Sequence, residues 1–198
     1  MTDPAPGEAS DDSLRQATYA LLAALLRTPP DAAMKARLGA IEAEDPQLPG
    51  LPGAWAALKE AAQQLDVAAV DREYHKLFIG LGRGELVPYG SWYQTGFLME
   101  KPLALLRQDL AALGIARQDQ VAEPEDHAAF LCEVMALLGN DCDLSLHQAR
   151  FFDRHLAPWL DRFFKDLQRA ETARFYRAVG RLGEAFFALE QRYLAMPV

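Results

Sequence analysis

The chain has few of the residues that mark extracellular or membrane proteins. Only two cysteines, Cys132 and Cys142, occur among 198 residues. Two thiols are too few for a disulfide framework in a chain of this length. No stretch approaches the roughly 18 uninterrupted apolar residues of a membrane-spanning helix. The first residues, MTDPAPGEASDD, are acidic and lack the apolar run of a secretory signal. We therefore expect a cytoplasmic protein that does not enter a membrane.

Positive charge is also scarce. Lysine and arginine total 20 against 28 aspartates and glutamates, which gives a net charge of −8. A surface for nucleic acid needs a basic face that releases counterions from phosphates, so this balance argues against nucleic acid as a partner. It suits a partner that carries arginine or lysine, although many acidic proteins have no such partner. Apolar residues make up 51% of the chain, enough for a sizeable core.

Motifs for metal binding and nucleophilic catalysis are missing. No histidine follows a glutamate by three residues, and no His-Glu-x-x-His occurs; the histidines are His75, His127, His147 and His155. Ser91 lies in Tyr-Gly-Ser-Trp, which differs from the Gly-x-Ser-x-Gly turn of hydrolases. We therefore predict no metal site, no catalytic residue and no resident cofactor.

A glycine-rich loop leaves two alternatives open. Gly80, Gly82 and Gly84 alternate, but neither the preceding strand nor the following Lys-Ser or Lys-Thr of a phosphate-binding loop is present. A tight turn is the simpler interpretation. The alternatives are a nucleotide-binding or nucleotide-hydrolysing helical protein that uses this loop, with Arg83 as the residue to test, and a helical adaptor without chemistry of its own.

Helical periodicity covers most of the chain and no run alternates like a β-strand, so the predicted fold class is all-α. The residues from Pro46 to Gly53 are expected to form a loop. Apolar spacing, caps and breaks predict helices over 13–27, from Asp31 onward, 55–65, 67–78, 92–99, 102–113, 124–140, 152–167 with a break near Pro158, and 175–193.

We expect a single helical domain of roughly ten helices in two lobes joined by a hinge. Its parts are a flexible tail at 1–12, an N-lobe at 13–114, a connector at 115–123 and a C-lobe at 124–198. A hinge at the connector permits domain swapping, so both a monomer and a domain-swapped dimer stay open.

Two segments stand out as candidate peptide-binding surfaces. The first is aromatic, with rings that give a large contact area at low entropic cost; its residues are Phe78, Pro88, Tyr89, Ser91, Trp92 and Tyr93. The second is Glu125-Asp126-His127, whose carboxylates suit the arginines of a bound peptide. The alternatives are that the rings fill gaps between helices and that the acids cap a helix.

These segments resemble the TorD/DmsD/NarJ-like redox enzyme maturation chaperones. The resemblance rests on the order and spacing of Tyr74-x-x-Leu77-Phe78-x-Gly80, Pro88-Tyr89-x-Ser91-x-Tyr93, Pro124-Glu125-Asp126-His127 and Phe151-Phe152-x-x-His155-Leu156-x-Pro158-Trp159. It implies an all-helical cytoplasmic chaperone, not an enzyme. Such a protein binds the twin-arginine leader or the apoenzyme of a molybdopterin oxidoreductase and delays export until the cofactor is inserted.

The resemblance also implies where partners bind. It places the Tyr89–Tyr93 loop and the Glu125–His127 motif on the family's recognition surface. Gly90 stands where many members carry a larger, often acidic residue. Some members bind guanine nucleotide weakly. The run Gly80-Leu-Gly-Arg-Gly-Glu-Leu is similar to the branch associated with formate dehydrogenases, whose client need not be exported.

Overall fold

Helices form the regular secondary structure of the described residues, so the all-α prediction is confirmed. The computed structural model describes residues 11–43, 45–80, 82–116, 123–140 and 145–196. Their α-helices are α1 (Asp11–Arg27), α2 (Ala32–Gly39), α3 (Gly50–Gln63), α4 (Val67–Tyr74), α5 (Gly90–Thr95), α6 (Lys101–Ala112), α7 (Ala128–Asn140), α8 (Gln148–Phe151), α9 (Leu160–Arg169) and α10 (Phe175–Leu194). Two π-helical turns, η1 (His75–Ile79) and η3 (Phe152–Leu156), and a 3-10 turn, η2 (Ser145–His147), complete them.

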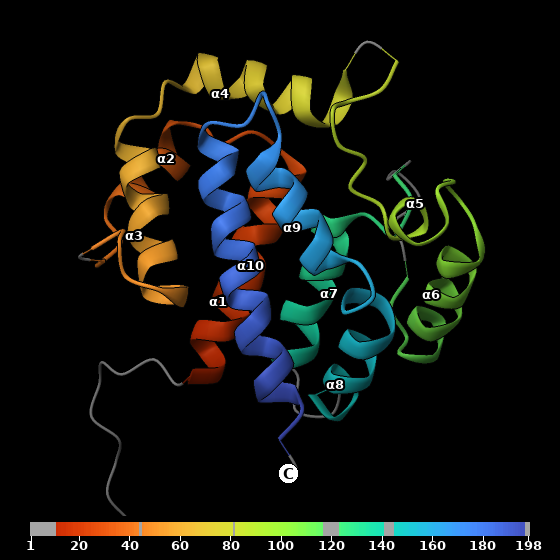
Figure 1. Cartoon of the computed structure of the whole chain (residues 1–198). Helices are drawn as coiled ribbons and strands as arrows, with labels where there is room; N and C mark the ends of the chain where they lie inside the picture. Colours follow the sequence, from red (N-terminus) through yellow and green to blue (C-terminus); the bar gives the residue numbers. More distant parts are fainter. Residues whose placement is uncertain (1–10, 44, 81, 117–122, 141–144, 197–198) are drawn as a thin grey trace, which may run out of the picture.

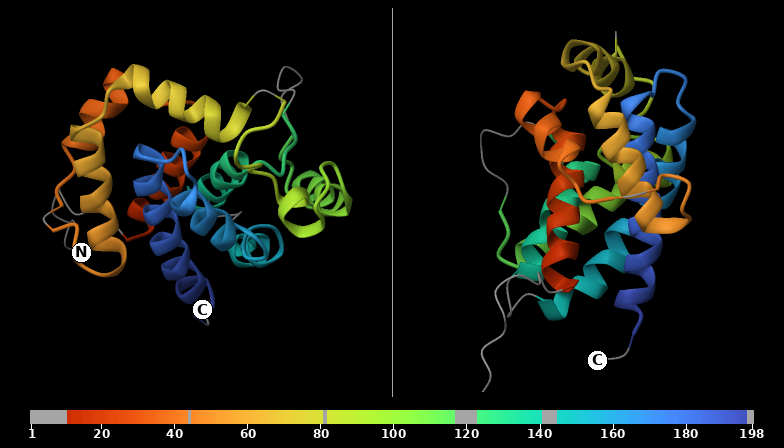
Figure 2. Two further views of the ribbon diagram at one scale, coloured as in Figure 1. Left: turned by 45° about the horizontal axis from the view of Figure 1, so that its top comes forward. Right: turned by 90° about the vertical axis from the view of Figure 1, so that its left-hand side faces the viewer.

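The centre of the molecule is formed by α1, α7, α9 and α10 (Figure 1). Helix α1 packs mainly on α7, while α10 packs on α9 on one side and on α3 on the other. Helix α4 crosses the ends of these helices, and α5 and α6 form a pair at the opposite edge from α3, as the views in Figure 2 show. None of the helices that the structure describes is both long and apolar enough to cross a membrane.

The expected lobes exchange extensive contacts. Helix α1, from the expected N-lobe, packs against α7 of the expected C-lobe, and α3 packs against α10. Contacts of this kind occur both within one domain and between two lobes, so the division into lobes and a hinge stays a prediction. Residues 1–10 of the expected tail and 117–122 of the expected connector lie outside the described residues.

The core explains why these helices pack so closely. The largest fully buried side chains are aromatic or leucine and include Trp159, Tyr19, Tyr176, Phe152 and Phe163. Helices α9 and α10 approach through Gly183, where an added β-carbon would lie 2.2 Å from the Phe164 ring. Only glycine leaves room for that ring at this crossing, so α9 and α10 can bury aromatic side chains between them.

Several helix ends agree with the sequence. Asp31 caps α2, because its carboxylate accepts a hydrogen bond from the Met34 backbone N–H at 2.7 Å. The chain breaks at Pro158 and resumes as α9 at Leu160. Helix α6 presents a buried stripe at the predicted spacing, formed by Leu103, Leu106 and Leu110.

Other boundaries differ from the prediction. Helix α3 begins at Gly50, inside the expected loop, because a proline such as Pro52 is tolerated in a first turn whose N–H groups have no intrahelical partner. Helix α5 ends before Met99, since Gly96 adopts a left-handed conformation at φ 82°. Helix α7 begins at Ala128, so Glu125 and Asp126 precede the helix and do not lie in its first turn.

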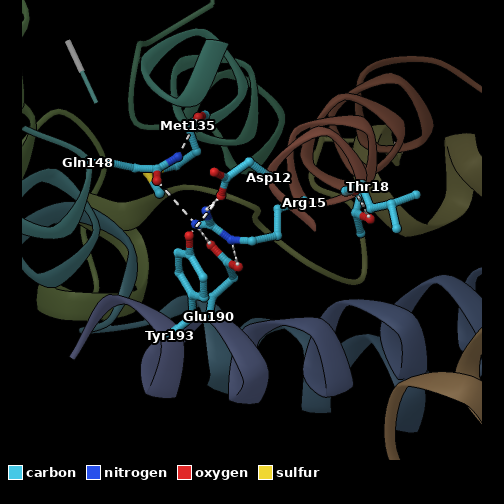
Figure 3. A network of polar contacts seen from close by, with 8 residues as sticks. Asp12, Arg15, Thr18, Met135, Gln148, Glu190 and Tyr193 are labelled. Atoms are coloured by element: carbon cyan, nitrogen blue, oxygen red, sulfur yellow. Dashed lines mark hydrogen bonds and ion pairs between the residues drawn. The ribbon is translucent and has the colours of Figure 1, made fainter. Parts of the chain in front are cut away.

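A buried ion pair joins the two ends of the described chain (Figure 3). The Arg15 guanidinium of α1 donates two hydrogen bonds to the Glu190 carboxylate of α10, at 2.6 and 2.7 Å, and both side chains are buried. Arg15 also donates to Gln148 at 3.1 Å and stacks over the Tyr193 ring. Burial alone would lower the pKa of Arg15, but the hydrogen bonds and charge of Glu190 raise it overall. The guanidinium therefore stays charged in the folded state.

Candidate functional site

The aromatic segment and the acidic motif lie directly against each other. Tyr89 and His127 form an isolated antiparallel bridge, and their rings meet edge to face with centroids 5.0 Å apart. The backbone N–H of Gly90 donates to the carbonyl of Asp126 at 2.9 Å. Two segments that are distant in sequence thus share one short stretch of paired backbone at the start of α5 and α7.

Asp126 connects the two segments through its side chain. Its Oδ2 accepts a hydrogen bond from the Ser91 backbone N–H at 2.7 Å, at the first turn of α5. The residue is only 3% exposed. Its Oδ1 is buried and has no hydrogen-bond partner among the described residues. A buried carboxylate oxygen without a donor is costly, so this atom is a natural acceptor for a group from outside.

The neighbours of Asp126 are held by the chain itself. Glu125 Oε2 accepts two hydrogen bonds from Arg107 of α6, at 3.0 and 2.8 Å, and these raise the pKa of Arg107. The His127 Nδ1 accepts from the Ala129 backbone N–H at 3.1 Å, at the start of α7. Burial lowers the pKa of His127 and outweighs the opposing charge of Glu123. His127 is therefore a neutral hydrogen-bond acceptor near pH 7.

The rings of the aromatic segment face in different directions. Tyr93 packs against Trp159 with centroids 5.4 Å apart, and its hydroxyl donates to Asp166 at 3.1 Å. Trp92 is half-buried beneath the guanidinium of Arg83. A β-carbon on Gly90 would lie 3.0 Å from the Trp159 indole nitrogen. The indole thus occupies space beside Gly90 that a larger residue would need.

A cavity of about 300 Å³ opens beside this junction. Residues of α5, α6, α7 and η3 line it together with Asp126: Gly90, Gln94, Thr95, Lys101, Pro102, Leu105, Leu106, Leu131, Arg154 and His155. The two basic groups on η3 are already paired, since Arg154 and His155 both bond to the Asp109 carboxylate, at 2.9 and 2.6 Å. This leaves Asp126 as the carboxylate that lines the cavity with an oxygen free of a partner among the described residues.

An exposed apolar loop, Phe97-Leu98-Met99, follows the cavity residue Thr95 and precedes Lys101. Phe97 is 68% exposed and Met99 72%. Met99 has φ 59°, a left-handed conformation that is uncommon for a residue with a side chain. Consecutive exposed apolar side chains beside a cavity are typical of a binding surface for an apolar partner. The junction of α5 and α7, the cavity and the Phe97–Met99 loop together form the candidate site.

Comparisons with known proteins place the chain in a family. The model of the nitrate reductase delta subunit family matches residues 44–165, more than half of the chain. The chain belongs to the nitrate reductase delta subunit family. This group includes TorD- and DmsD-type chaperones, so the resemblance noted from the motifs is confirmed.

Several relatives in this family are named chaperones. The chaperone protein TorD of Vibrio cholerae is 30% identical over 142 residues, which cover 66% of this chain and 63% of that protein. TorD of Vibrio parahaemolyticus is 27% identical over 172 residues, covering 80% and 79%. A probable Tat proofreading chaperone DmsD of Haemophilus influenzae is 30% identical over 115 residues, covering 57% and 56%. The chain thus matches somewhat under two thirds of the length of the Vibrio cholerae protein.

A solved structure shares the fold of this family member. A redox enzyme maturation protein from Archaeoglobus fulgidus superposes with a TM-score of 0.58 at 16% identity, covering 94% of this chain and 99% of the other. At this identity the likeness concerns the fold alone. It agrees with the all-helical, TorD-like architecture expected from the motifs.

The structure brings most of the predicted site residues of this family member together. Pro88, Tyr89 and Ser91 meet Asp126 and His127 at the α5–α7 junction. Glu125 lies in the same turn and is held by Arg107; Trp92 and Tyr93 continue α5. Phe78 packs elsewhere, against Tyr74 and Tyr176. The assignment of these residues to peptide binding stays a prediction.

Some cavity residues were not anticipated from the sequence. Arg154 and His155 of η3 line the cavity and both bond to Asp109 of α6, and the sequence did not predict this cluster as part of the site. The Phe97–Met99 loop has a detectable signature: an apolar run that continues past a helix-ending glycine, Gly96. Such a run has no helix in which to bury its side chains, and this predicts exposure.

The structure also describes the residues considered for metal binding and the glycine-rich loop. Among the described residues no group of three or more His, Cys, Asp or Glu side chains is placed to hold a metal ion. The glycine loop has a structural reason, since a β-carbon on Gly84 would lie 2.5 Å from the Leu77 carbonyl oxygen. The returning chain there donates from Leu86 N–H to that carbonyl at 2.8 Å. These contacts support the tight-turn interpretation.

Proposed function

We propose that this chain is a cytoplasmic chaperone that binds the leader peptide or the apoenzyme of a molybdopterin oxidoreductase, with formate dehydrogenase as a candidate client. It assists cofactor insertion and delays export until maturation is complete. It acts by reversible binding and performs no reaction of its own. Membership of a family with named TorD and DmsD chaperones supports the chaperone role.

One structural observation supports a location for the binding site. Asp126, whose buried Oδ1 has no partner among the described residues, is a lining residue of the cavity, and the exposed Phe97–Met99 loop follows the cavity residue Thr95. A twin-arginine leader offers guanidinium groups followed by an apolar stretch. A guanidinium that reaches Asp126 gains a charge-assisted hydrogen bond, and the apolar stretch covers Phe97 and Met99. The acidic and the apolar parts of the site thus each have a counterpart in the ligand.

The geometry refines which acid does the binding. Glu125 is already neutralised by Arg107, and Asp126 retains one free acceptor atom within the described structure. We infer that Asp126 receives the arginine while Glu125 and Arg107 hold the turn in place. Tyr89 and Tyr93 fix the start of α5 through their hydrogen bonds to Glu123 and Asp166. The α5 segment is then the rigid wall on which a peptide lies.

The test is a binding titration by calorimetry with the full chain. The ligand is a synthetic leader with two adjacent arginines and an apolar stretch, compared with the same peptide carrying alanine in place of both arginines. We expect affinity in the micromolar range for the first, which lets a chaperone release its client, and loss of most of it for the second. Equal affinity for both peptides would contradict the proposed role of Asp126.

A matched pair of variants distinguishes binding at the Phe97–Met99 loop from nonspecific binding to exposed apolar side chains. Phe97→Ser in the α5–α6 loop removes an exposed ring at the proposed site and should weaken binding of the arginine peptide. Leu146→Ser removes another exposed apolar side chain, 82% exposed, that lies in η2 away from this cavity. It should leave affinity unchanged. Equal effects of the two substitutions would show that the loop is not the binding surface.

A further inference from the structure

A second, basic cleft lies away from the candidate site, where α3, α4 and the beginning of α10 meet. Its volume is about 560 Å³. In Figure 1, α3, α4 and the beginning of α10 come together on the side away from α5 and α6. The cleft has no lining residue in common with the cavity at Asp126.

Four cations line this cleft in two short rows. Arg72 and Lys76 are four residues apart on α4 and η1, and Arg174 and Arg177 are three apart at the start of α10. All four side chains are exposed. Arg174 precedes α10 with a non-helical backbone, so the shared lining of the cleft, and not a common helical face, brings it near Arg177.

These cations lack acidic partners within the described part of the chain. No ion pair joins any of the four to a carboxylate there, and the recorded side-chain bonds of Arg174 and Arg177 go to backbone carbonyls. Elsewhere on the surface, cations such as Arg27 and Lys165 do pair with carboxylates. The cleft thus carries four cations against two lining carboxylates, in a chain with eight more acids than bases.

The two carboxylates that line the cleft are already occupied by helix ends. Glu73 is buried and accepts hydrogen bonds from the backbone N–H groups of Arg174 and Tyr176, both at 2.8 Å, and of Phe175 at 3.2 Å. Asp66 caps α4 through the Ala68 backbone N–H at 3.1 Å. The helix N-termini are therefore satisfied internally, and the side-chain cations remain available to a ligand.

Part of the cleft lining is apolar. It contains the buried side chains Leu65, Val70 and Phe175, with the small residues Ala61 and Ala69 beside them. A free phosphate makes no use of an apolar lining. An amphipathic protein segment does, because its aliphatic side chains cover the apolar residues while its carboxylates reach the cations.

We propose that this cleft docks an acidic amphipathic segment of a partner protein. A long polyanion such as RNA fits less well, because the net charge of −8 repels it beyond the cleft. The cleft is separate from the cavity at Asp126, so this second surface does not depend on the proposed function. One chain then presents an acidic acceptor to a basic segment and a basic cleft to an acidic one.

The experiment uses the full chain and a fluorescent probe peptide of about 15 residues, long enough to form a helix on binding. The peptide carries leucine and alanine on one face and glutamate on the other, and a counterpart carries glutamine in place of every glutamate. Fluorescence anisotropy should show binding of the acidic peptide, weaker binding at high salt, and little binding of the glutamine peptide. Equal binding of the two peptides would overturn the proposal.

Matched variants locate the binding. Combining Arg72→Gln with Arg177→Gln should weaken the acidic peptide roughly five-fold, as expected for the loss of two exposed ion pairs. Combining Arg37→Gln with Arg192→Gln removes the same charge from exposed positions outside the cleft and should have little effect. Equal effects of the two pairs, or displacement of the peptide by an equal concentration of inorganic phosphate, would overturn the docking proposal. Lys76→Gln alone provides a second test of the cleft.

Discussion

The Asp126 carboxylate accepts a hydrogen bond at 2.7 Å from the backbone N–H of Ser91, which lies 35 positions earlier in the chain. One oxygen of a single carboxylate therefore caps α5, while the other has no partner among the described residues. The two interpretations of this acid, as a helix cap and as a binding group, are compatible because they use different atoms. Substitutions can separate them.

Asp126→Asn should keep the fold and lose binding, because an amide oxygen still accepts from Ser91 N–H but carries no charge for an arginine. Asp126→Ala should lose both, with a decrease of about 1–2 kcal/mol in the free energy of unfolding from the missing cap. Urea unfolding and calorimetry with the arginine leader provide the two measurements. If the Asn variant binds as tightly as the natural chain, Asp126 is a cap alone.

The Arg15–Glu190 pair should dominate the stability of the α1–α10 contact (Figure 3). Glu190→Gln leaves the buried Arg15 charge short of its main partner, and we expect a loss of roughly 3–5 kcal/mol in unfolding free energy. Replacing both residues, Arg15→Met with Glu190→Leu, removes the desolvated charges together and should cost less than the single change. A double variant less stable than Glu190→Gln in urea unfolding would contradict this account.

Acidification should destabilise the fold through buried histidine. Burial lowers the folded-state pKa of His127 below its ordinary value of 6.5. The unfolded chain therefore takes up a proton more readily than the folded one, and the stability contributed by neutral His127 is full above about pH 6.5 and declines as the pH falls through that value toward the folded pKa. Burial lowers the pKa of His155 in the same direction despite Asp109.

Comparing urea unfolding at about pH 7.5 and about pH 5.5 measures this effect. His127→Gln removes one titrating group, so its unfolding free energy should fall less between the two pH values than that of the natural chain. His75→Gln removes an exposed histidine and serves as the control. An unchanged pH dependence in His127→Gln would contradict the assignment.

Local patterns predicted the helices of this fold but not the contacts between residues that are far apart in the sequence. The spacing of Leu103, Leu106 and Leu110 gave α6, and Asp31 gave the start of α2, because periodicity and caps are properties of neighbouring residues. The cap of α10 could not be found this way. Glu73, about a hundred positions earlier in the chain, supplies it.

In the candidate site, too, local patterns indicated the residues but not the contacts between them. The sequence identified Tyr89 and Asp126 as members, and the family resemblance implied that their segments meet. Which oxygen of Asp126 stays free depends on the contact of its side chain with the Ser91 N–H, a contact between segments far apart in the sequence that no local pattern specifies. His155 lines the cavity and lies in the π-helical turn η3. An apolar period of 3.6 residues predicts an α-helix and does not predict such a turn.

A pair of glycine substitutions tests how the bundle core is packed. Gly183→Ala in α10 places a methyl group 2.2 Å from the Phe164 ring of α9. The ring is fully buried and cannot move away freely, so we expect a loss of about 1–3 kcal/mol in unfolding free energy. Gly39→Ala in α2 meets only the Gln63 side chain at 4.0 Å. There the same change should stabilise the chain by about 0.5–1 kcal/mol, since alanine favours the helix.

The two variants change composition identically, so their difference in urea unfolding reports packing alone. The Gly183→Ala variant should also show altered near-ultraviolet circular dichroism, because the aromatic residues of α9 and α10 must shift together. Equal stabilities for the two variants would mean that α9 and α10 can separate at low cost. The close crossing would then not fix the position of α9, and Trp159, which precedes α9 and packs beside Gly90, would not be a rigid support for α5.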